Sequence, residues 1–457
     1  MADYRPDPLI LSLGGDFYDA VVPARFPQCT PRFLNRRWAE RVGLVLDDDS
    51  WARHFCRFEP LPGNLTEPLA LRYHGHQFRV YNPEIGDGRG FTFAQLRDDR
   101  DRLLDLGTKG SGQTPYSRHA DGRLTLKGGV RELLATEMLE ALGVKTSKTF
   151  ALFETGEELE RGDEPSPTRS SVLTRLSHGH IRIGTFQRLA FFGDVENLRK
   201  LTRYCLEELY GEHPSQDDEN ALRLFDLVSD ATATLAASYM AAGFVHGVLN
   251  SDNINVTGES FDYGPWRFTP EWDPQFTAAY FDHYGLYAFG RQPEAIHWNL
   301  AQFAGCLSLL AEASKLSDLL HEWSGRFEQS LVEALLKRLG LEERPNGSTV
   351  AAALLKALAS REQTIDRIFF DWRGGHDPGT EAYPGDAFRE LAMLLEGRQR
   401  PKRHPYWSGD APGSMHIEEV EAIWSAIAER DDWQPFNNKV KAIRLMGDAM
   451  EQDARAG

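Results

Sequence analysis

Cysteine is scarce in this sequence. Its 457 residues include four cysteines, Cys29, Cys56, Cys205 and Cys306, and no two of them form a C-x-x-C pair. So few cysteines in a chain of this length exclude a disulfide scaffold as the basis of the fold. We therefore expect a protein of the reducing cytoplasm.

Long apolar runs are missing as well. No stretch approaches the roughly 20 apolar residues that a membrane-spanning helix requires. The sequence opens M-A-D-Y-R-P-D-P-L-I-L-S-L, which has a short apolar run and no basic leader. We expect neither a signal peptide nor a membrane-spanning segment.

Basic residues are outnumbered. Lys and Arg total 51 against 68 Asp and Glu, which gives a formal net charge of −17. Because neutralising a nucleic-acid backbone requires a basic surface, this balance argues against a general nucleic-acid binder. An anionic ligand would need a local basic pocket, so clustered arginines are more informative here than in a basic protein.

The pattern of apolar residues in the first part of the chain indicates strands and turns. A G-D-G-R-G turn at 86–90 predicts a β-hairpin that pairs residues 78–81 with residues 91–93. Apolar spacing then predicts a helix over 130–142, with Gly143 at its C-terminal end. Strands are expected over 149–153 and 170–176, separated by a polar loop.

From Asp194 onward helical spacing dominates. Asp194 is placed to cap a helix, a second long helix is expected over 218–241 with its end at Gly243, and a late amphipathic helix covers 420–427. At 457 residues the chain is long for one hydrophobic core. We therefore predict a bilobal α+β fold, with a strand-rich N-lobe (1–190), a larger helical C-lobe (191–457) and a junction near 186–193.

The segment D-N-I-N-V-T-G-E-S-F-D-Y-G after the second helix offers hard oxygen ligands. Asn253 and Asp262 are the natural pair for a magnesium ion that is also held by substrate phosphates. Asp252 stands beside them as an acceptor for a hydroxyl proton. Asp, Asn and Gly also fill ordinary polar turns, and this second interpretation carries about equal weight for the segment alone.

Lys109 and Glu132 extend the pattern. Lys109 follows an apolar stretch where a strand would end, and Glu132 lies on the helix predicted next. In kinase-like sites a strand lysine binds nucleotide phosphates and is held by a helix glutamate. A solvated surface pair is the alternative, but the order lysine, glutamate, long helix, Asn-containing loop and D-Y-G is hard to obtain by chance.

Arginines and glycines supply candidate phosphate contacts. Arg175 and Arg182 lie seven residues apart within apolar sequence, where each would face either a ligand phosphate or an internal carboxylate. Gly86 and Gly88 would let backbone N–H groups approach an anion beside Arg89, although glycine-rich hairpin turns are common. The H-x-H pairs at 74–76 and 178–180 have no recognisable third metal ligand, so structural roles are favoured for them.

These motifs together resemble the selenoprotein O (SelO) family, kinase-fold proteins once regarded as pseudokinases. The resemblance is carried by G-D-G-R at Gly86, K-G-S-G-Q-T-P-Y-S-R at Lys109, A-D-G-R at Ala120, L-T-R-L-S-H-G-H-I-R-I-G-T-F-Q at Leu173 and H-G-V-L-N-S-D-N-I-N-V-T-G-E-S-F-D-Y-G-P at His246. It implies a protein-kinase-like fold in which ATP is flipped and AMP is transferred to Ser, Thr or Tyr hydroxyls of proteins, self-modification included.

The resemblance also implies roles for individual residues. Asp252 would be the catalytic base, and Asn253 and Asp262 would hold Mg²⁺ or Mn²⁺. The remaining residues would bind the nucleotide: Lys109 with its partner Glu132, Arg175, Arg182, Gly86, Gly88, Arg89, Asp121 and Gly122, together with Asp262 through its metal.

Two departures matter for function. Ordinary kinases place their base five residues before the metal-binding Asn, a position that Val248 occupies here, so Asp252 would have to serve a differently posed nucleotide. Family members often end in a cysteine or selenocysteine, whereas this sequence ends E-Q-D-A-R-A-G, and the redox control linked to that residue is not expected. A kinase-like phosphotransferase and a nucleotide-binding scaffold remain the alternatives to AMP transfer.

Overall fold

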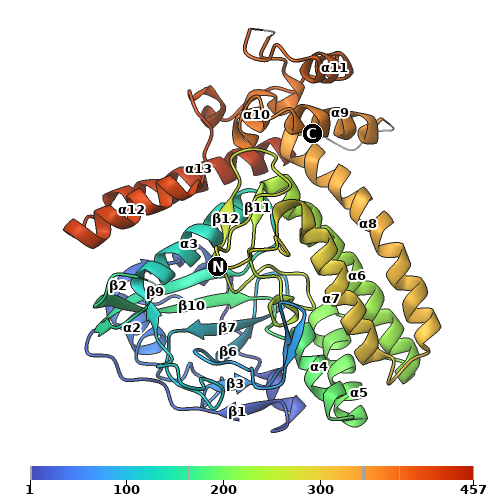
Figure 1. The fold of residues 1–457 in the computed structure, drawn as a ribbon. Coiled ribbons are helices and arrows are strands. Elements are labelled where there is room, and N and C mark those ends of the chain that lie inside the picture. The colour runs from blue at the N-terminus through green and yellow to red at the C-terminus, as the bar shows by residue number, and fades with distance from the viewer. Residues whose placement is uncertain (1–2, 163, 342–345, 380, 456–457) are drawn as a thin grey trace.

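A curled antiparallel sheet forms the first part of the molecule (Figure 1), in a computed structural model that describes residues 3–162, 164–341, 346–379 and 381–455. The sheet has eight strands in the order β1-β3-β6-β7-β10-β9-β2, with β8 paired to β10. Their bounds are Tyr18–Ala20 (β1), Thr30–Leu34 (β2), Leu69–Leu71 (β3), Thr92–Arg97 (β6), Leu103–Lys109 (β7), Leu124–Thr125 (β8), Lys148–Leu159 (β9) and Thr168–Ser177 (β10).

Both faces of this sheet are covered. The helix α3 (Leu126–Ala141) packs on β9 and β10, and Thr125 caps it by accepting a hydrogen bond from the Gly128 N–H. On the other side, α1 (Arg36–Arg41) buries Trp38, and α2 (Asp48–Phe55) buries Trp51 and Phe55 against Phe150. Because both faces are covered, every residue of β7 is buried, Lys109 included.

Helices make up most of the remaining chain. The long helix α6 (Asp217–Ala242) packs against α7 (Gln292–Leu307) and α8 (Ala313–Leu339), as Figure 1 shows. Gly243 ends α6 in a left-handed conformation, φ 67°, which glycine adopts without steric cost. The other helices are α4 (Ile183–Phe191), α5 (Val195–Tyr204), α9 (Gly347–Ala359), α10 (Ile365–Asp371), α11 (Asp386–Leu395), α12 (Ile417–Arg430) and α13 (Gln434–Arg455).

The C-terminal helices return to the sheet. In Figure 1 α12 and α13 run across the outer side of α3. Arg444 on α13 holds the Glu137 carboxylate with two hydrogen bonds, of 2.7 and 2.8 Å. Lys127 at the start of α3 pairs with Glu421 on α12 at 2.7 Å. The two ends of α3 are therefore anchored to the C-terminal helices.

The α+β class is confirmed, as are the helix after Asp194, the long helix ending at Gly243 and the late amphipathic helix. The predicted hairpin around residues 86–90 is wrong. Residues Val80–Asn82 (β5) pair with Gly75–Gln77 (β4), whereas β6 pairs with β3 and β7. The reversal that makes the hairpin is the two-residue turn Phe78–Arg79, which lacks the Asn or Gly that usually marks such a turn.

Three further expectations can be compared with the structure. The loop expected after residue 156 is shorter in the structure, because β9 continues to Leu159 and β10 begins at Thr168. Cys29 and Cys56 form a disulfide, which the expectation of a reducing cytoplasm did not anticipate. The division into two lobes stays a prediction, and most of its expected junction lies within α4 and the turn that follows.

No helix among the described residues is long and apolar enough to cross a membrane. A short antiparallel pair, β11 (Phe244–Val245) and β12 (Arg267–Phe268), follows α6 and brackets the segment that contains Asp252 and Asp262.

Candidate active site

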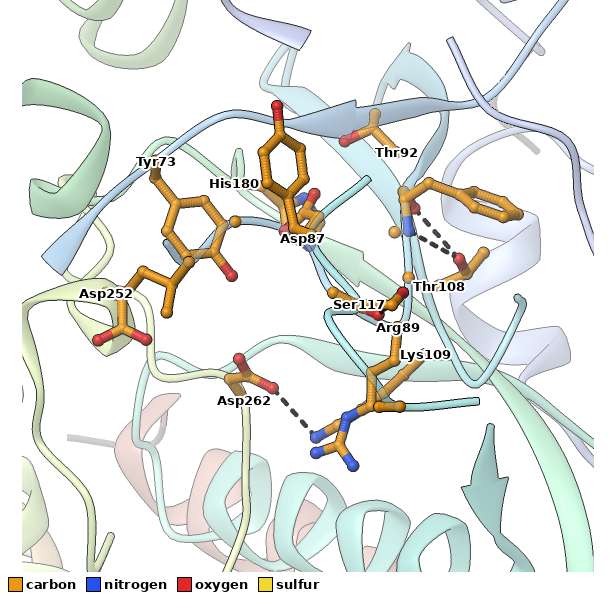
Figure 2. A pocket seen from close by; sticks show the side chains of 18 of the residues that line it. Tyr73, Asp87, Arg89, Thr92, Thr108, Lys109, Ser117, His180, Asp252 and Asp262 are labelled. Atoms are coloured by element: carbon orange, nitrogen blue, oxygen red, sulfur yellow. Dashed lines mark hydrogen bonds and ion pairs between the residues drawn. The ribbon is translucent and has the colours of Figure 1, made fainter. Parts of the chain in front are cut away.

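A cavity of about 320 Å³ contains most of the predicted site residues (Figure 2). It is lined by the turn 85–92, the end of β7, the loop 116–120, Arg175 on β10, and both Asp252 and Asp262. A second, larger cavity of about 630 Å³ lies between α3, α6, α8 and α13 and includes none of the predicted residues. The sequence motifs therefore converge on the smaller cavity.

Lys109 is the centre of a buried ion-pair network. Its Nζ lies 2.6 Å from Glu132 Oε2 and 3.0 Å from Asp262 Oδ1, and Figure 2 shows Asp262 turned toward it. Lys109 ends β7 and Glu132 lies on α3, so the sheet and the helix that packs on it bring the two side chains together. The predicted lysine–glutamate pair is present in the structure.

Arg175 joins the same network from the neighbouring strand. In the register of β10 against β7, Arg175 lies opposite Gly107, two residues before Lys109. Its Nη1 is 3.5 Å from Glu132 Oε1 and 3.4 Å from Asp262 Oδ1, and its buried Nε has no hydrogen-bond partner. Because an orphaned guanidinium N–H is costly to bury, this atom is a donor available to an anion.

Arg182 does not belong to the cavity wall: it is buried, 1% exposed, behind the lining residues Tyr73, Asp87 and Asp252. Its guanidinium lies over the rings of Tyr73 and Phe261, at 4.1 and 5.0 Å from their centroids. It donates to the Asp252 backbone carbonyl at 3.3 Å and pairs with Asp87 at 3.4 Å. Of the two open options for the arginines, the structure shows the internal carboxylates: Arg175 contacts Glu132 and Asp262, and Arg182 contacts Asp87. Contact with a ligand phosphate stays a prediction.

Asp252 carries the least satisfied carboxyl group of the site. It lies in a 3₁₀ turn, Ser251–Asn253, that packs against the backbone of Gly184. Burial raises the pKa of Asp252 to about 6, against the opposing effect of the Arg182 charge. Its Oδ1 is buried and has no hydrogen-bond partner. A carboxyl group with a pKa close to neutrality, on a residue that lines the cavity, suits a general base.

Asp262 behaves differently. Burial would raise its pKa, but the charges of Lys109, Arg175 and Arg182 hold that pKa well below the usual range. It therefore stays ionised at all physiological pH values. Its backbone is left-handed, φ 62°, which is uncommon for a non-glycine residue and typical of residues placed for function.

Asn253 and Asp262 are the predicted metal ligands. The Asn253 Nδ2 donates to the Val248 carbonyl at 2.9 Å, so Oδ1 is the atom that would face a cation. Asp262 lines the cavity, and Asn253 does not belong to its wall. The described residues contain no group of three or more His, Cys, Asp or Glu side chains that could hold a metal alone. Two protein oxygens nevertheless fit Mg²⁺, which is usually completed by waters and substrate phosphates.

The glycine turn at 86–90 forms one wall of the cavity. A Cβ at Gly86 would lie 2.4 Å from the Tyr116 ring, and Ser117 Oγ donates to the Gly88 carbonyl, so the loop that contains Tyr116 closes tightly over this turn. The exposed Arg89 side chain also lines the cavity. The turn thus brings a cation to the cavity wall, whereas the predicted approach of its backbone N–H groups to an anion stays a prediction.

Asp121 and Gly122 are not part of the cavity wall. The Asp121 carboxylate pairs with Arg161 at 2.8 Å and accepts the Arg123 N–H. The Gly122 carbonyl accepts from the Gly112 N–H at 3.1 Å. In the structure these two residues hold the loop that follows Lys109, and Ala120 is the lining residue next to them. Any contact between them and a nucleotide stays a prediction.

Sequence reasoning missed several lining residues. Tyr73 and Tyr116 have no motif of their own, and Gln77, beside the Asp252 carboxylate, lies in the hairpin that was misplaced. His180 of the second H-x-H pair also lines the cavity and contacts Asp105 at 3.1 Å through Nδ1. Tyr116 could have been suspected from its place within K-G-S-G-Q-T-P-Y-S-R.

The cavity thus combines several cations suited to phosphates with two aspartates of contrasting proton affinity, a combination suited to enzymes that transfer part of a nucleotide. Residues 2–399 match the family model described as protein adenylyltransferase SelO. The chain therefore belongs to the SelO family of nucleotidyltransferases.

Named relatives agree with this assignment. The chain is 40% identical to the protein nucleotidyltransferase YdiU of Synechocystis sp., over 96% of this chain and 97% of the relative. It is 39% identical to the protein of the same name from Trichormus variabilis, over 96% of both chains. It is 40% identical to the one from Gloeobacter violaceus, over 97% of this chain and 95% of the relative.

Proposed function

We propose that this protein transfers AMP from ATP to Ser, Thr or Tyr hydroxyls of proteins, its own chain included. In this proposal the two parts of the chain form a protein-kinase-like cleft, ATP lies in it with the α-phosphate toward the acceptor, and a divalent cation is held by Asn253 and Asp262. A cytoplasmic location completes the proposal.

One observation carries the proposal. The unpaired, buried Asp252 carboxyl and the cation network of Lys109 and Arg175 line a single cavity. Cations of this kind bind the phosphates of a nucleotide, and a base with a pKa of about 6 accepts a proton at neutral pH. A site that only binds a nucleotide would gain nothing from a buried carboxyl whose pKa is raised toward neutrality.

The proposed step is a nucleophilic substitution at the α-phosphorus of ATP. The oxygen of the acceptor hydroxyl attacks the α-phosphorus of ATP, and its proton passes to Asp252. The bond from the α-phosphorus to the oxygen that bridges to the β-phosphate breaks, and pyrophosphate leaves with that electron pair. In this proposal Lys109, Arg175 and Arg182 bind the phosphate oxygens whose charge increases in this step.

The cation would supply charge neutralisation of the phosphates when bound. Asp262 is suited to hold it, because its carboxylate remains ionised, while Lys109 and Arg175 neutralise it in the absence of ligand. Oxygen ligands do not separate Mg²⁺ from Mn²⁺. The names of the relatives also do not specify which base the nucleotide substrate carries.

A kinase-like phosphotransferase is the second candidate. It is favoured by the 2.6 Å Lys109–Glu132 pair, which ordinary kinases also use. Against it stands Val248, an aliphatic residue at the position where those kinases place their base. Because Asp252 lies next to the metal-binding Asn253 instead, the acceptor would meet a different phosphate.

The test is labelling of a whole-cell extract with ATP labelled at the α-phosphate, in the presence of magnesium. The wild-type protein should label extract proteins, and its Asp252→Ala variant should label them at least about a hundredfold more slowly, as expected for a lost general base. Equal labelling by the two proteins would remove Asp252 from the catalytic role.

A further inference from the structure

Exposed aromatic residues gather at one place on the molecule. Among the described residues, the strongly exposed aromatic side chains are Phe191, Phe192, Tyr280, Phe281 and Tyr284, which we call the aromatic rim. Tyr280 and Tyr284 are 82% and 92% exposed. Water-exposed aromatic side chains of this kind are characteristic of surfaces that bind another chain.

The rim flanks the hairpin β4–β5 on two sides. Phe191, at the end of α4, stacks on Tyr81 of β5 with ring centroids 5.4 Å apart. Phe281, on the loop 276–288, lies 5.8 Å from Phe78 in the hairpin turn. Val80 at the start of β5 is itself 70% exposed. The hairpin thus joins two groups of exposed aromatic residues into one surface.

The same hairpin is bonded to the catalytic segment. The Phe78 N–H donates to Asn250 Oδ1 at 3.0 Å, and the His76 N–H donates to Ser251 Oγ at 2.7 Å. Gln77 between them lines the nucleotide cavity beside Asp252. The hairpin therefore connects the rim to the part of the cavity wall that contains Gln77 and Asp252, where an acceptor hydroxyl would reach the proposed base.

The turn of the hairpin β4–β5 has a strained backbone that surrounding contacts hold in place. Phe78 and Arg79 have φ of 50° and 61°, a conformation that side-chain-bearing residues rarely adopt together. The Tyr287 hydroxyl shares Asn250 Oδ1 with the Phe78 N–H, which ties the loop 276–288 to the turn as well. Strained backbone that is fixed by several contacts is common where a surface binds a ligand.

We propose that the aromatic rim binds the acceptor segment of the protein substrate, and that preferred acceptors carry apolar or aromatic residues beside the modified hydroxyl. This inference rests on the proposed function. Tyr and Phe side chains bury large apolar areas at little entropic cost, so they supply affinity to varied segments while the hydroxyl enters the cavity.

The experiment uses a library of synthetic peptides, each with one central Ser, Thr or Tyr and either apolar or polar neighbours. Three full-length variants are compared with the wild type: Phe191→Ser with Phe192→Ser, Tyr280→Ser with Tyr284→Ser, and the control Leu309→Ser with Met393→Ser. The control residues are 44% and 70% exposed and lie outside the rim. Their substitution likewise removes two exposed apolar side chains from the surface.

The wild type and the control should modify apolar-flanked peptides with kcat/KM about tenfold above that of polar-flanked ones, as expected for interface aromatics. Each rim variant should lose this preference through a higher KM, while its Kd for ATP stays that of the wild type. The same variants should label whole extract proteins more weakly. A misfolded variant would also lose ATP binding, so the Kd for ATP distinguishes misfolding from a specific loss of acceptor binding.

Three results would overturn the inference. Rim variants that keep the wild-type preference for apolar-flanked peptides, or that label extract proteins as strongly as the wild type, would exclude the rim as the acceptor-binding surface. The proposed AMP transfer would be unaffected. A concentration-dependent wild-type dimer in sedimentation, lost in the rim variants, would assign the rim to a second copy of this chain. Failure of the wild type to modify any peptide or protein would overturn the proposed function itself, and this inference with it.

Discussion

Replacing Asp252 with asparagine should make the protein more stable and inactive at once. The wild-type carboxyl has a pKa of about 6 in the folded protein and 3.8 in the unfolded chain, because burial penalises its charged form. The folded state therefore holds this proton more tightly than the unfolded state. The stability that this proton contributes is complete below pH 3.8 and is lost as the pH rises through 6.

The magnitude follows from the two pKa values. Their difference corresponds to about 3 kcal/mol, which is the cost of ionising Asp252 in the folded protein at pH 7.5. At pH 5 the group is mostly protonated, and the cost is only about 1.6 kcal/mol. Asparagine has nearly the same shape and no charge, so Asp252→Asn should raise the free energy of unfolding by up to these amounts.

The assay is denaturant unfolding of both proteins at the two pH values, beside AMP transfer to protein. In the wild type, transfer should fall roughly tenfold from pH 7 to pH 5 as Asp252 takes up its proton, while the variant should be inactive at both. A lower unfolding free energy for Asp252→Asn at pH 7.5 would contradict the proposed burial cost. A flat wild-type pH profile over this range would contradict the role as base.

Three other predictions test the remaining parts of the site. Asp262→Asn should abolish transfer and lower the free energy of unfolding by about 2 kcal/mol, because Lys109 loses a carboxylate partner in a partly buried network; unchanged stability in urea titration would contradict that network. Gly86→Ala should raise the KM for ATP about tenfold, since its Cβ would displace the Tyr116 ring, whereas Gly15→Ala, which meets no atom within 4 Å, should leave it unchanged; equal KM values in the two variants would refute the tight closure of this wall. Chelation of divalent cations with EDTA should stop transfer until Mg²⁺ or Mn²⁺ is returned, and transfer that persists in EDTA would refute the metal proposal.

The convergence of the site could be predicted from the sequence because its parts follow one another in a recognisable order. Lys109 ends an apolar strand, Glu132 lies on the next helix, and Asp252 and Asp262 follow the long helix that ends at Gly243. Each of these positions is set by local spacing and by helix or strand ends, which a single sequence records well.

The parts that could not be predicted depend on contacts between distant segments. The hairpin turn at Phe78–Arg79 carries none of the usual turn residues, since its conformation is imposed by contacts with Asn250 and the aromatic rings around it. The turn signal at 86–90 did not mark a hairpin, because the strands on its two sides pair with other strands.

Two other failures have the same origin. Asp121 is turned away from the cavity by Arg161, which lies 40 residues further along the chain. Cys29 and Cys56, 27 residues apart, meet only because β2 and α2 pack on the same part of the sheet. No local pattern in the sequence contains these pairings.

The most direct test of AMP transfer uses two samples of ATP, one labelled at the α-phosphate and one at the γ-phosphate, with a single modified protein identified by mass spectrometry. The proposed function predicts label on the protein only from the α-labelled ATP, an added mass the size of AMP, and release of the γ-label as pyrophosphate. Label from the γ-phosphate, with an added mass the size of one phosphate, would contradict it and make the protein a phosphotransferase.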